Sequence, residues 1–337
     1  MAGSEASAGF THEEFSGEAL RVRNRVPCVV RSMTTAPSDP APIKSAALVV
    51  NAKSRKGQKM FKRACASMSG LPFPVDAHAV DDPDDLEQTV RTALAKKPDL
   101  LILGGGDGTI SGLVDLMVGH DVILGVLPLG TANSFARTLG IPLTVEGAVD
   151  VIRTGAPRRI DLGMIDGDYF ANCAAMGISP KIAETVPHGL KKILGRVGYL
   201  GWAAYQFARF RPFTLIVGEG DDAVRMRVVE VRISNGPFHG GTELVDAAAV
   251  DSGEIVVQAV MGHVKRRLVM NWLASVFRHE SRHEKVRDFR GKSLKITTIP
   301  KLPISIDGEV LAKTPVTAKV AAGIIRVMAP VSVPPER

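Results

Sequence analysis

A glycine-rich loop that holds one carboxylate and one hydroxyl is the part of this sequence best suited to chemistry. In the run Leu101–Thr109 an apolar strand ends in Gly-Gly-Gly-Asp-Gly-Thr, and a helix is predicted from Thr109 to Met117. Glycines let backbone N–H groups approach a polyanion because no Cβ intervenes, and a helix N-terminus adds unpaired donors and partial positive charge. The loop therefore predicts a phosphate-binding site, with Asp107 available to a metal ion, a hydroxyl or a water.

Two common phosphate-binding motifs do not fit this loop. The dinucleotide pattern Gly-x-Gly-x-x-Gly needs a third glycine where this chain has Thr109, and the Walker A pattern needs a Gly-Lys-Ser/Thr ending that the loop lacks. The plainer interpretation is a tight strand–helix turn without a ligand. Four glycines around one Asp are more than such a turn requires, which favours a ligand site.

The composition bounds the class of protein. The 337 residues leave room for two domains, and 45% of them are hydrophobic, which supplies a sizeable core. The net charge of +7 suits anionic partners, but with only 5% aromatic residues we expect no base-stacking surface and no nucleic-acid partner. The cysteines Cys28, Cys65 and Cys173 form no disulfide framework, which favours a reducing, cytoplasmic location. Residues 1–42 are polar and are predicted to be a disordered tail.

Strands alternate with helices over the first half of the chain. The apolar runs Ala46–Val50, Leu100–Leu103 and Val122–Leu127 predict buried strands, each followed by a polar or glycine-rich loop and a helix, and Asp82 and Pro83 predict the start of another helix. This alternation predicts a parallel, doubly wound, Rossmann-like sheet. Its ligand crevice is expected at the carboxyl ends of the strands.

After about residue 157 the pattern changes to short alternating segments, which predict a mostly antiparallel, β-sandwich-like domain. Helices are predicted to interrupt it at about residues 190–209 and 264–279. The predicted strands are Tyr169–Cys173, Thr214–Val217, Val224–Ser234, Ile255–Val260, Lys292–Ile299, Ile304–Ile306 and Ile324–Met328.

Three motifs fall in the order seen in the soluble diacylglycerol and sphingosine-type lipid kinases. They are Gly105–Thr109, Pro128–Arg137 and Ile306–Glu309. In addition, Asn51–Gly57 resembles that family's first nucleotide loop, and Phe170–Gly177 resembles its entry into the β-rich domain. The resemblance extends over about residues 44–329.

The resemblance implies an ATP- and Mg²⁺-dependent kinase that phosphorylates a lipid hydroxyl. Diacylglycerol is the expected acceptor, with a sphingoid base or phosphatidylglycerol as alternatives. It implies a nucleotide-binding domain over residues 43–157, completed by residues 310–330, and a lipid-substrate domain over residues 158–309. It further implies a protein that contacts an anionic membrane peripherally, and a homodimer is compatible with it.

Site residues follow by position in the family's motifs. Glu309 matches the proton acceptor, Asp107 is its rival and a candidate ligand of the ATP-bound Mg²⁺, and Asp307 is adjacent to Glu309. The residues expected to contact ATP are Asn51, Ala52, Lys53, Ser54, Arg55, Gly105, Gly106, Asp107, Gly108, Thr109, Ile110, Ser111, Thr131 and Asn133. Taken alone, Asp307-Gly308-Glu309 is also a strong hairpin-turn signal.

One departure from the family concerns a second metal ion. Bacterial members often carry an Asp-Gly pair near a structural Mg²⁺, and here Ser252 occupies the position of that Asp. Asp251 is the remaining candidate ligand, although its side chain is expected on the other face of a strand.

Three other functions compete with a lipid kinase. Soluble NAD kinases share Gly-Gly-Asp-Gly-Thr, and a nucleotide-binding regulator without turnover would keep the same loops. The segment His279-Glu280-Ser281-Arg282-His283 matches the His-Glu-x-x-His motif of zinc peptidases, but its charged neighbours are unlike the apolar setting of such helices. Two basic clusters, at residues 191–196 and 265–290, suit docking to an anionic bilayer or are solvated faces.

Overall fold

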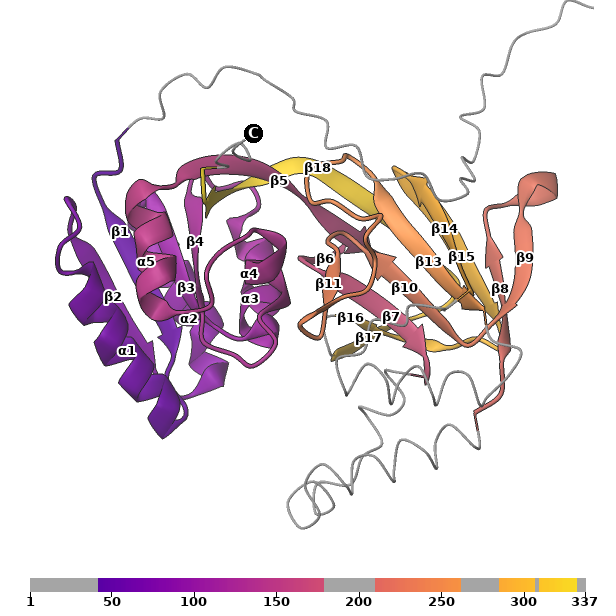
Figure 1. The fold of residues 1–337 in the computed structure, drawn as a ribbon, viewed down its shortest axis with the longest axis horizontal. Helices are drawn as coiled ribbons and strands as arrows, with labels where there is room; N and C mark the ends of the chain where they lie inside the picture. Colours follow the sequence, from indigo (N-terminus) through magenta and orange to yellow (C-terminus); the bar gives the residue numbers. More distant parts are fainter. Residues whose placement is uncertain (1–41, 179–209, 262–284, 307–308, 332–337) are drawn as a thin grey trace, which may run out of the picture.

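A computed structural model describes residues 42–178, 210–261, 285–306 and 309–331. Figure 1 shows an α/β half, which contains α1 to α5, beside a half made mainly of strands. The two long strands β5 (Ala156–Ile165) and β18 (Val316–Ala329) run from one half into the other. The fold class predicted from the sequence, a Rossmann-like part with a mostly antiparallel β-sandwich-like part, is confirmed.

The α/β half is built on four parallel strands in the order β2-β1-β3-β4. Three of them match the predicted apolar runs: β1 (Ala46–Asn51), β3 (Leu100–Gly105) and β4 (Ile123–Pro128). The fourth, β2 (Val75–Val80), was not predicted. It is an edge strand with mixed exposure, so it lacks the continuous apolar run that marks a buried parallel strand.

The helices begin at capping residues that the sequence supplies. The Ser54 hydroxyl accepts the Gly57 N–H at 3.0 Å at the start of α1 (Arg55–Met68). Asp82 caps a 3₁₀ turn at Pro83–Asp85 that leads into α2 (Leu86–Ala95). The helix predicted from Thr109 begins two residues earlier, because α3 spans Asp107–Val114 and a 3₁₀ turn follows to Met117. The remaining helices are α4 (Ser134–Thr138) and α5 (Val145–Thr154).

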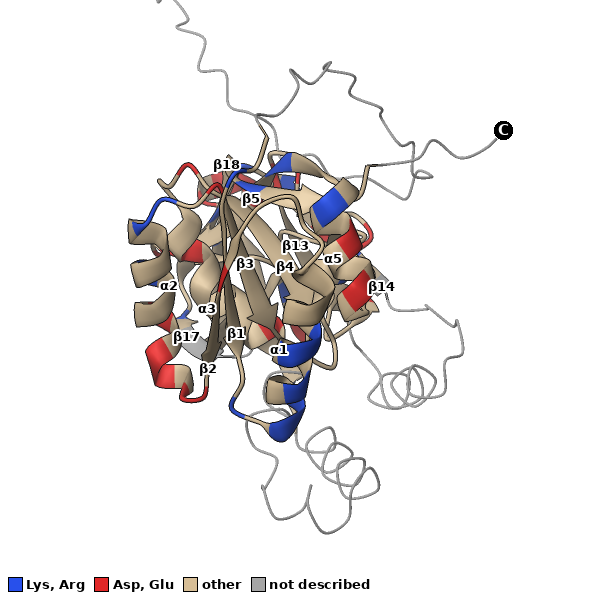
Figure 2. Ribbon diagram, turned by 90° about the vertical axis from the view of Figure 1, so that its left-hand side faces the viewer, with Lys and Arg blue, Asp and Glu red and all other residues tan. Residues whose placement is uncertain are grey.

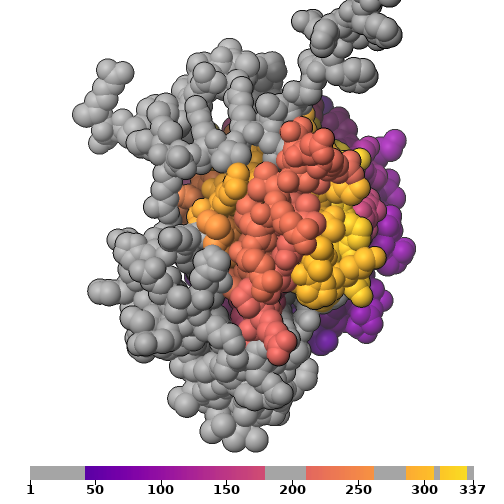
Figure 3. All heavy atoms as spheres, turned by 90° about the vertical axis from the view of Figure 1, so that its right-hand side faces the viewer, coloured from indigo at the N-terminus to yellow at the C-terminus, as the bar shows by residue number. Residues whose placement is uncertain are grey.

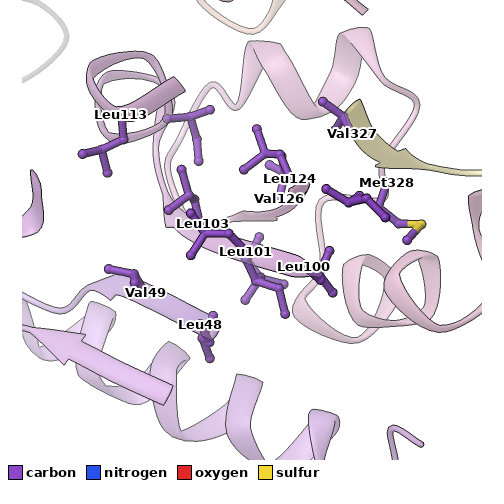
Figure 4. Packing of buried hydrophobic residues seen from close by; sticks show 14 of the residues in the cluster. Leu48, Val49, Leu100, Leu101, Leu103, Leu113, Leu124, Val126, Val327 and Met328 are labelled. Carbon is purple, nitrogen blue, oxygen red and sulfur yellow. The ribbon is translucent and has the colours of Figure 1, made fainter. Parts of the chain in front are cut away.

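The core of this half is aliphatic and is centred on β3. Leu100, Leu101 and Leu103 are fully buried, and side chains from β1 and β4 and from α3 surround them (Figure 4). Val327 and Met328 of β18 belong to the same core. The C-terminal strand is therefore part of the α/β half, as the family resemblance implies.

The large sheet continues into the β-rich half without interruption. β18 pairs in parallel with β4 at one end and antiparallel with β15 (Ser293–Ile299) at the other. β8 (Phe213–Val217) and β9 (Val224–Val228) follow β15 in the same sheet. Figure 3 shows the outer surface of this half, where these strands lie beside segments from the end of the chain.

A second, antiparallel sheet packs on this end of the large sheet and completes the sandwich. Phe170, which ends β6 (Asp168–Phe170), and Phe289 are fully buried between the layers. Its strands, in order, are β14 (Lys285–Gly291), β13 (Ile255–Met261), β10 (Glu230–Ser234), β7 (Cys173–Gly177), β16 (Pro303–Ile306) and β17 (Glu309–Lys313).

Two predicted strands are divided in the structure. Residues 224–234 form β9 in the large sheet and β10 in the second sheet, because the chain changes sheet at Val229. Residues 169–173 likewise divide between β6 and β7. The predicted segments 190–209 and 264–279 lie outside the described residues, as does the tail over residues 1–41. Within the described residues, no helix is both long and apolar enough to span a bilayer.

Asp161 of β5 ties the two halves together. Its side chain is 3% exposed, and its two carboxylate oxygens each accept a backbone N–H at 2.7 Å, from Gly253 and from Gly323. Gly253 lies in the loop before β13, and Gly323 lies at a bulge of β18. One buried carboxylate thus holds three segments that are far apart in the sequence.

We expect Asp161→Asn to lower the free energy of unfolding by about 2–3 kcal/mol, because an amide NH₂ would face one of the two backbone N–H donors. Chemical denaturation of the purified protein measures this change. Asp166→Asn is the matched control, since Asp166 is exposed in a turn at φ 52° that Asn also adopts readily. Equal stability of the two variants would contradict the role given to Asp161.

Candidate phosphate-binding and phosphoryl-transfer site

The two glycine loops meet at the carboxyl ends of β3 and β4. The parallel register pairs Gly104 with Leu127 and Gly105 with Pro128, so both chains leave the sheet at the same level. A backbone hydrogen bond of 2.9 Å from Leu129 N–H to the Gly105 carbonyl extends this pairing past the end of the sheet. The first loop then enters α3 at Asp107, and the second reaches α4 at Ser134.

Close backbone contact explains some of the glycines in these loops. A Cβ on Gly130 would lie 2.5 Å from the Cα of Gly106, and a Cβ on Gly105 would lie 2.4 Å from the Thr109 side chain. Gly108 differs from both, because a Cβ there would meet nothing within 4 Å. Gly108 and Thr131 are exposed, so they are the parts of the two loops that are open to a ligand.

Asp107 links the two loops. Its Oδ1 accepts the backbone N–H of Phe135 at 3.3 Å, and Phe135 lies in the first turn of α4. The carboxylate is partly exposed at the first position of α3, where the helix dipole favours a negative charge. Asp107 is therefore placed between two helix N-termini, and one of its oxygens has no hydrogen bond to the other loop.

Asn133 shapes the second loop from within. Its backbone is left-handed, with φ 48°, and its side chain is buried. The side-chain Oδ1 accepts the Gly130 N–H at 2.9 Å, while Nδ2 donates to the Gly130 carbonyl at 3.0 Å. Both ends of this amide are thus used inside the loop. Arg137 also stabilises the loop, because its Nε donates to the Ala132 carbonyl at 2.9 Å.

The first predicted nucleotide loop docks on the glycine loop. Asn51 Nδ2 donates to the Thr109 hydroxyl at 3.3 Å, and Asn51 Oδ1 accepts the Lys53 N–H at the same distance. Ala52 is fully buried, whereas Lys53, Ser54 and Arg55 are exposed. Lys and Arg residues are frequent along α1, which begins at this loop (Figure 2). Ile110, buried, and Ser111 continue α3 away from the loop tips.

The Ile306–Glu309 motif is described only in part. Asp307 and Gly308 lie outside the described residues, and Glu309 is described only through the backbone of β17, which pairs with Ile306. β16 pairs with β7 through Ile306 and Ala174, so the end of β16 and the start of β17 lie near the residue at which β7 begins. Asn172 immediately precedes β7, and its buried Oδ1 finds no hydrogen-bond donor among the residues that the structure describes.

The structural Mg²⁺ that the family resemblance implies does not fit the loop before β13. The Ser252 hydroxyl lies 2.8 Å from the Ala249 carbonyl oxygen and 3.2 Å from that of Glu254, so it occupies the centre of this loop. Asp251 is turned to Arg158, with which it forms an ion pair at 2.5 Å. Among the described residues, no three His, Cys, Asp or Glu side chains gather as a metal site. The Ser252 hydroxyl group therefore lies between these carbonyl oxygens of the loop, in place of a metal ion.

A separate cavity of about 240 Å³ lies between α1 and β2. Leu71 and Phe73 contribute to it, and so does Cys65, whose thiol pKa is raised by burial. This cavity contains none of the glycine-loop residues, so it takes no part in the site. The motif His279–His283 lies outside the described residues.

Comparison with known proteins agrees with this arrangement. The diacylglycerol kinase catalytic domain family matches residues 45–165, and the YegS C-terminal NAD kinase beta sandwich-like domain matches residues 172–329. A diacylglycerol kinase of Staphylococcus epidermidis is 29% identical over 286 residues, covering 81% of this chain and 88% of the relative. One of Staphylococcus aureus is 28% identical over 302 residues, covering 81% and 88%.

The fold is shared with solved structures as well. A structure described as a diacylglycerol kinase from Bacillus anthracis superposes with a TM-score of 0.66 at 21% identity, covering 85% of this chain and 96% of the other. A second structure from that organism gives a TM-score of 0.70 at 20% identity, covering 88% and 98%. This chain belongs to the diacylglycerol kinase catalytic domain family. It is a lipid kinase of that family, and the resemblance given by its motifs is confirmed.

We expect Gly130→Ala to weaken ATP binding by about tenfold, which equals about 1.4 kcal/mol. The added methyl group must push the two loops apart where Gly130 meets Gly106. Isothermal titration with MgATP measures the change. Gly112→Ala in α3 is the control, because a Cβ at that position meets nothing within 4 Å. Unchanged affinity in the Gly130 variant would show that the close approach does not matter for ATP.

We expect the melting temperature of the wild-type protein without nucleotide to differ by less than about 2 °C between Mg²⁺ and EDTA, because Ser252 already satisfies its loop. Ser252→Asp adds a carboxylate beside two carbonyl oxygens, which is a donor set that suits Mg²⁺, so its melting temperature should rise with Mg²⁺. A Mg²⁺-dependent rise in the wild type that persists in Asp107→Asn would contradict a hydroxyl-closed loop. Differential scanning fluorimetry measures all three proteins.

Proposed function

We propose that this protein transfers the γ-phosphoryl group of ATP to the hydroxyl of diacylglycerol. The observation that carries the proposal is the contact between the two glycine loops. There α3 and α4 begin beside each other, and Asp107 lies between them. Two helix N-termini and exposed backbone N–H groups at the loop tips suit the phosphate oxygens of a nucleotide. The exposed Lys and Arg side chains of α1 add positive charge beside them.

The ATP-contacting residues proposed here are Asn51–Arg55, Gly105–Ser111, Thr131 and Asn133, which lie on the three loops. Gly108 and Thr131 offer open backbone and hydroxyl donors, whereas Asn133 acts by holding the loop in shape. Asp107 is the residue that would hold Mg²⁺ together with the phosphate oxygens, since carboxylate oxygen is the ligand Mg²⁺ prefers. Bound there, Mg²⁺ would neutralise the charge that develops on the transferred group.

A carboxylate is also needed to accept the proton of the attacking hydroxyl. We propose Glu309 for this role, with Asp107 as its rival and Asp307 as its neighbour in the sequence. The support is positional: Glu309 begins β17 and pairs with Ile306, which in turn pairs with Ala174 near the start of β7. Phosphoryl transfer depends mainly on positioning and charge, so a single base is sufficient.

Diacylglycerol is the proposed acceptor because the relatives that cover most of this chain carry that name. A sphingoid base and phosphatidylglycerol present a hydroxyl on an apolar tail as well. To reach such a substrate the protein must touch a bilayer, and we propose peripheral contact with an anionic membrane, for which the exposed cations of α1 are suited.

The test is a transfer assay with the full chain, γ-labelled ATP and Mg²⁺. Mixed micelles carry diacylglycerol, sphingosine or phosphatidylglycerol in parallel reactions, and a detergent-free reaction contains NAD. Label in the organic phase with diacylglycerol alone supports the proposal. Label in another lipid keeps the lipid kinase and corrects the acceptor, label in NAD replaces it with a soluble acceptor, and ATP binding without any transfer overturns the proposed activity.

We expect Asp107→Asn to lower kcat by about 100-fold or more, in the range of lost acid–base or charge assistance. The amide oxygen can still accept the Phe135 N–H, so the loops stay joined. Asp251→Asn is the matched control and should keep nearly full activity, because it removes only an exposed ion pair with Arg158. Equal and small effects from both would contradict the site. Glu309→Gln, measured alongside, tests Glu309 as the base by the same criterion.

A further inference from the structure

A small hairpin of the β-rich half reaches the second glycine loop. It consists of β11 (Phe238–His239) and β12 (Thr242–Glu243), joined by Gly240 and Gly241. Both glycines have positive φ, 59° and 82°, which is the signature of a type I′ turn. In Figure 1, β11 lies beside α4, between the two halves.

The tip of this hairpin is seated on the start of α4. The Gly241 N–H donates to the Ser134 hydroxyl oxygen at 3.0 Å, and Ser134 is 3% exposed. A Cβ on Gly241 would lie 3.2 Å from both the Cα and the carbonyl oxygen of Ala132. Gly236, at the base of the hairpin, is similarly close to the Thr138 side chain. The contact therefore combines a buried hydrogen bond with a fit so close that a Cβ on Gly241 would press against Ala132.

The other end of the hairpin is fixed to the β-rich half. Asn235 N–H donates to the Asn172 carbonyl at 2.8 Å, and the Asn235 side chain donates to the carbonyls of Asp161 and Ala171. On the far side, Leu244 and Val245 donate backbone N–H groups to the Pro237 carbonyl, which closes the hairpin, and Val245 packs with Val256 of β13. The hairpin is thus anchored at both strands, so the position of its tip follows that of the β-rich half.

We propose that Ser134 and Gly241 are positioning residues that align the second glycine loop with the β-rich half for phosphoryl transfer. Ser134 stands between Asn133, which shapes that loop, and Phe135, whose N–H binds Asp107. The hairpin tip therefore binds the residue that lies, in the sequence, between these two parts of the phosphate site. The inference deepens the proposed function and rests on it, because the β-rich half is taken to present the acceptor hydroxyl.

The two glycines of the turn provide a matched pair of variants. Asn adopts the left-handed conformation readily, so Gly240→Asn and Gly241→Asn both keep the turn. A Cβ on Gly240 meets nothing within 4 Å, whereas one on Gly241 meets Ala132. Gly241→Asn should lower kcat for lipid phosphorylation by about tenfold or more, as misplacement of reacting groups does. The kcat of Gly240→Asn should stay within about twofold of the wild-type value, because a side chain at this open position displaces nothing.

A readout that a general loss of stability would not produce is the separation of binding from turnover. The ATP affinity of Gly241→Asn, measured without lipid, should stay within about twofold of wild type, since the bonds of Asn133 and Asp107 lie inside the α/β half. Ser134→Ala should lower kcat in the same direction, because the Gly241 N–H loses its acceptor. Equal kcat in the two Asn variants would overturn the proposal, and so would an equal fall of kcat and ATP affinity in Gly241→Asn.

Hydrogen–deuterium exchange of residues 131–138 keeps this test separate from the activity itself. If wild type phosphorylates no lipid, the proposed function fails, and the alignment is judged by exchange alone. Faster exchange in Gly241→Asn than in both Gly240→Asn and wild type supports the contact of the hairpin tip with the start of α4. The same exchange in all three proteins overturns it.

Discussion

The backbone contact between Gly106 and Gly130 is the constraint on which the site depends. It follows from the parallel register of β3 and β4, which brings both loops out of the sheet at one level. Because no side chain fits between the loops, the N-termini of α3 and α4 lie side by side. Two partial positive charges at one point then suit a polyphosphate better than a single helix does. Asp107 can belong to both loops only in this arrangement.

The glycines of the first loop differ in the reason for which glycine is present. Gly105 is required because Thr109 packs against it, and Gly106 because the other loop does. Neither requirement involves a ligand, so a tight turn accounts for both. Gly108 has open space around it and no such packing reason. The exposed, uncrowded glycine is therefore the stronger structural argument for a phosphate site, although all of them look alike in the sequence.

Local patterns in the sequence predicted the elements whose stabilising contacts are local or uniform. β1, β3 and β4 are buried on both faces and appear as continuous apolar runs. β2, at an exposed edge, and the change of sheet at Val229 left no such pattern. The length of β18 also escaped prediction, because its pairing with β5 tolerates polar residues such as Lys319 and Arg326. These features depend on which distant strand lies alongside.

The same division applies to the site. The glycine loops and Asp107 were found from composition and spacing, and the family resemblance supplied Asn51–Arg55 and Glu309. The hydrogen bond between Ser134 and Gly241 was not predicted, since it joins residues 107 positions apart. Asn133 was expected to serve a ligand, yet both ends of its amide bind its own loop. A side chain's partner is a tertiary fact that residue type alone does not determine.

The two halves are held together by contacts of unequal strength, and the inequality bears on how the site works. β5 and β18 form one continuous sheet across the junction, and Asp161 adds two charge-assisted bonds from a buried carboxylate. The hairpin tip contributes one hydrogen bond between neutral groups, worth about 1 kcal/mol. Among these described contacts, the hydrogen bond between Gly241 and Ser134 is therefore weaker than the bonds of Asp161, and it is the one that lies next to the phosphate loops.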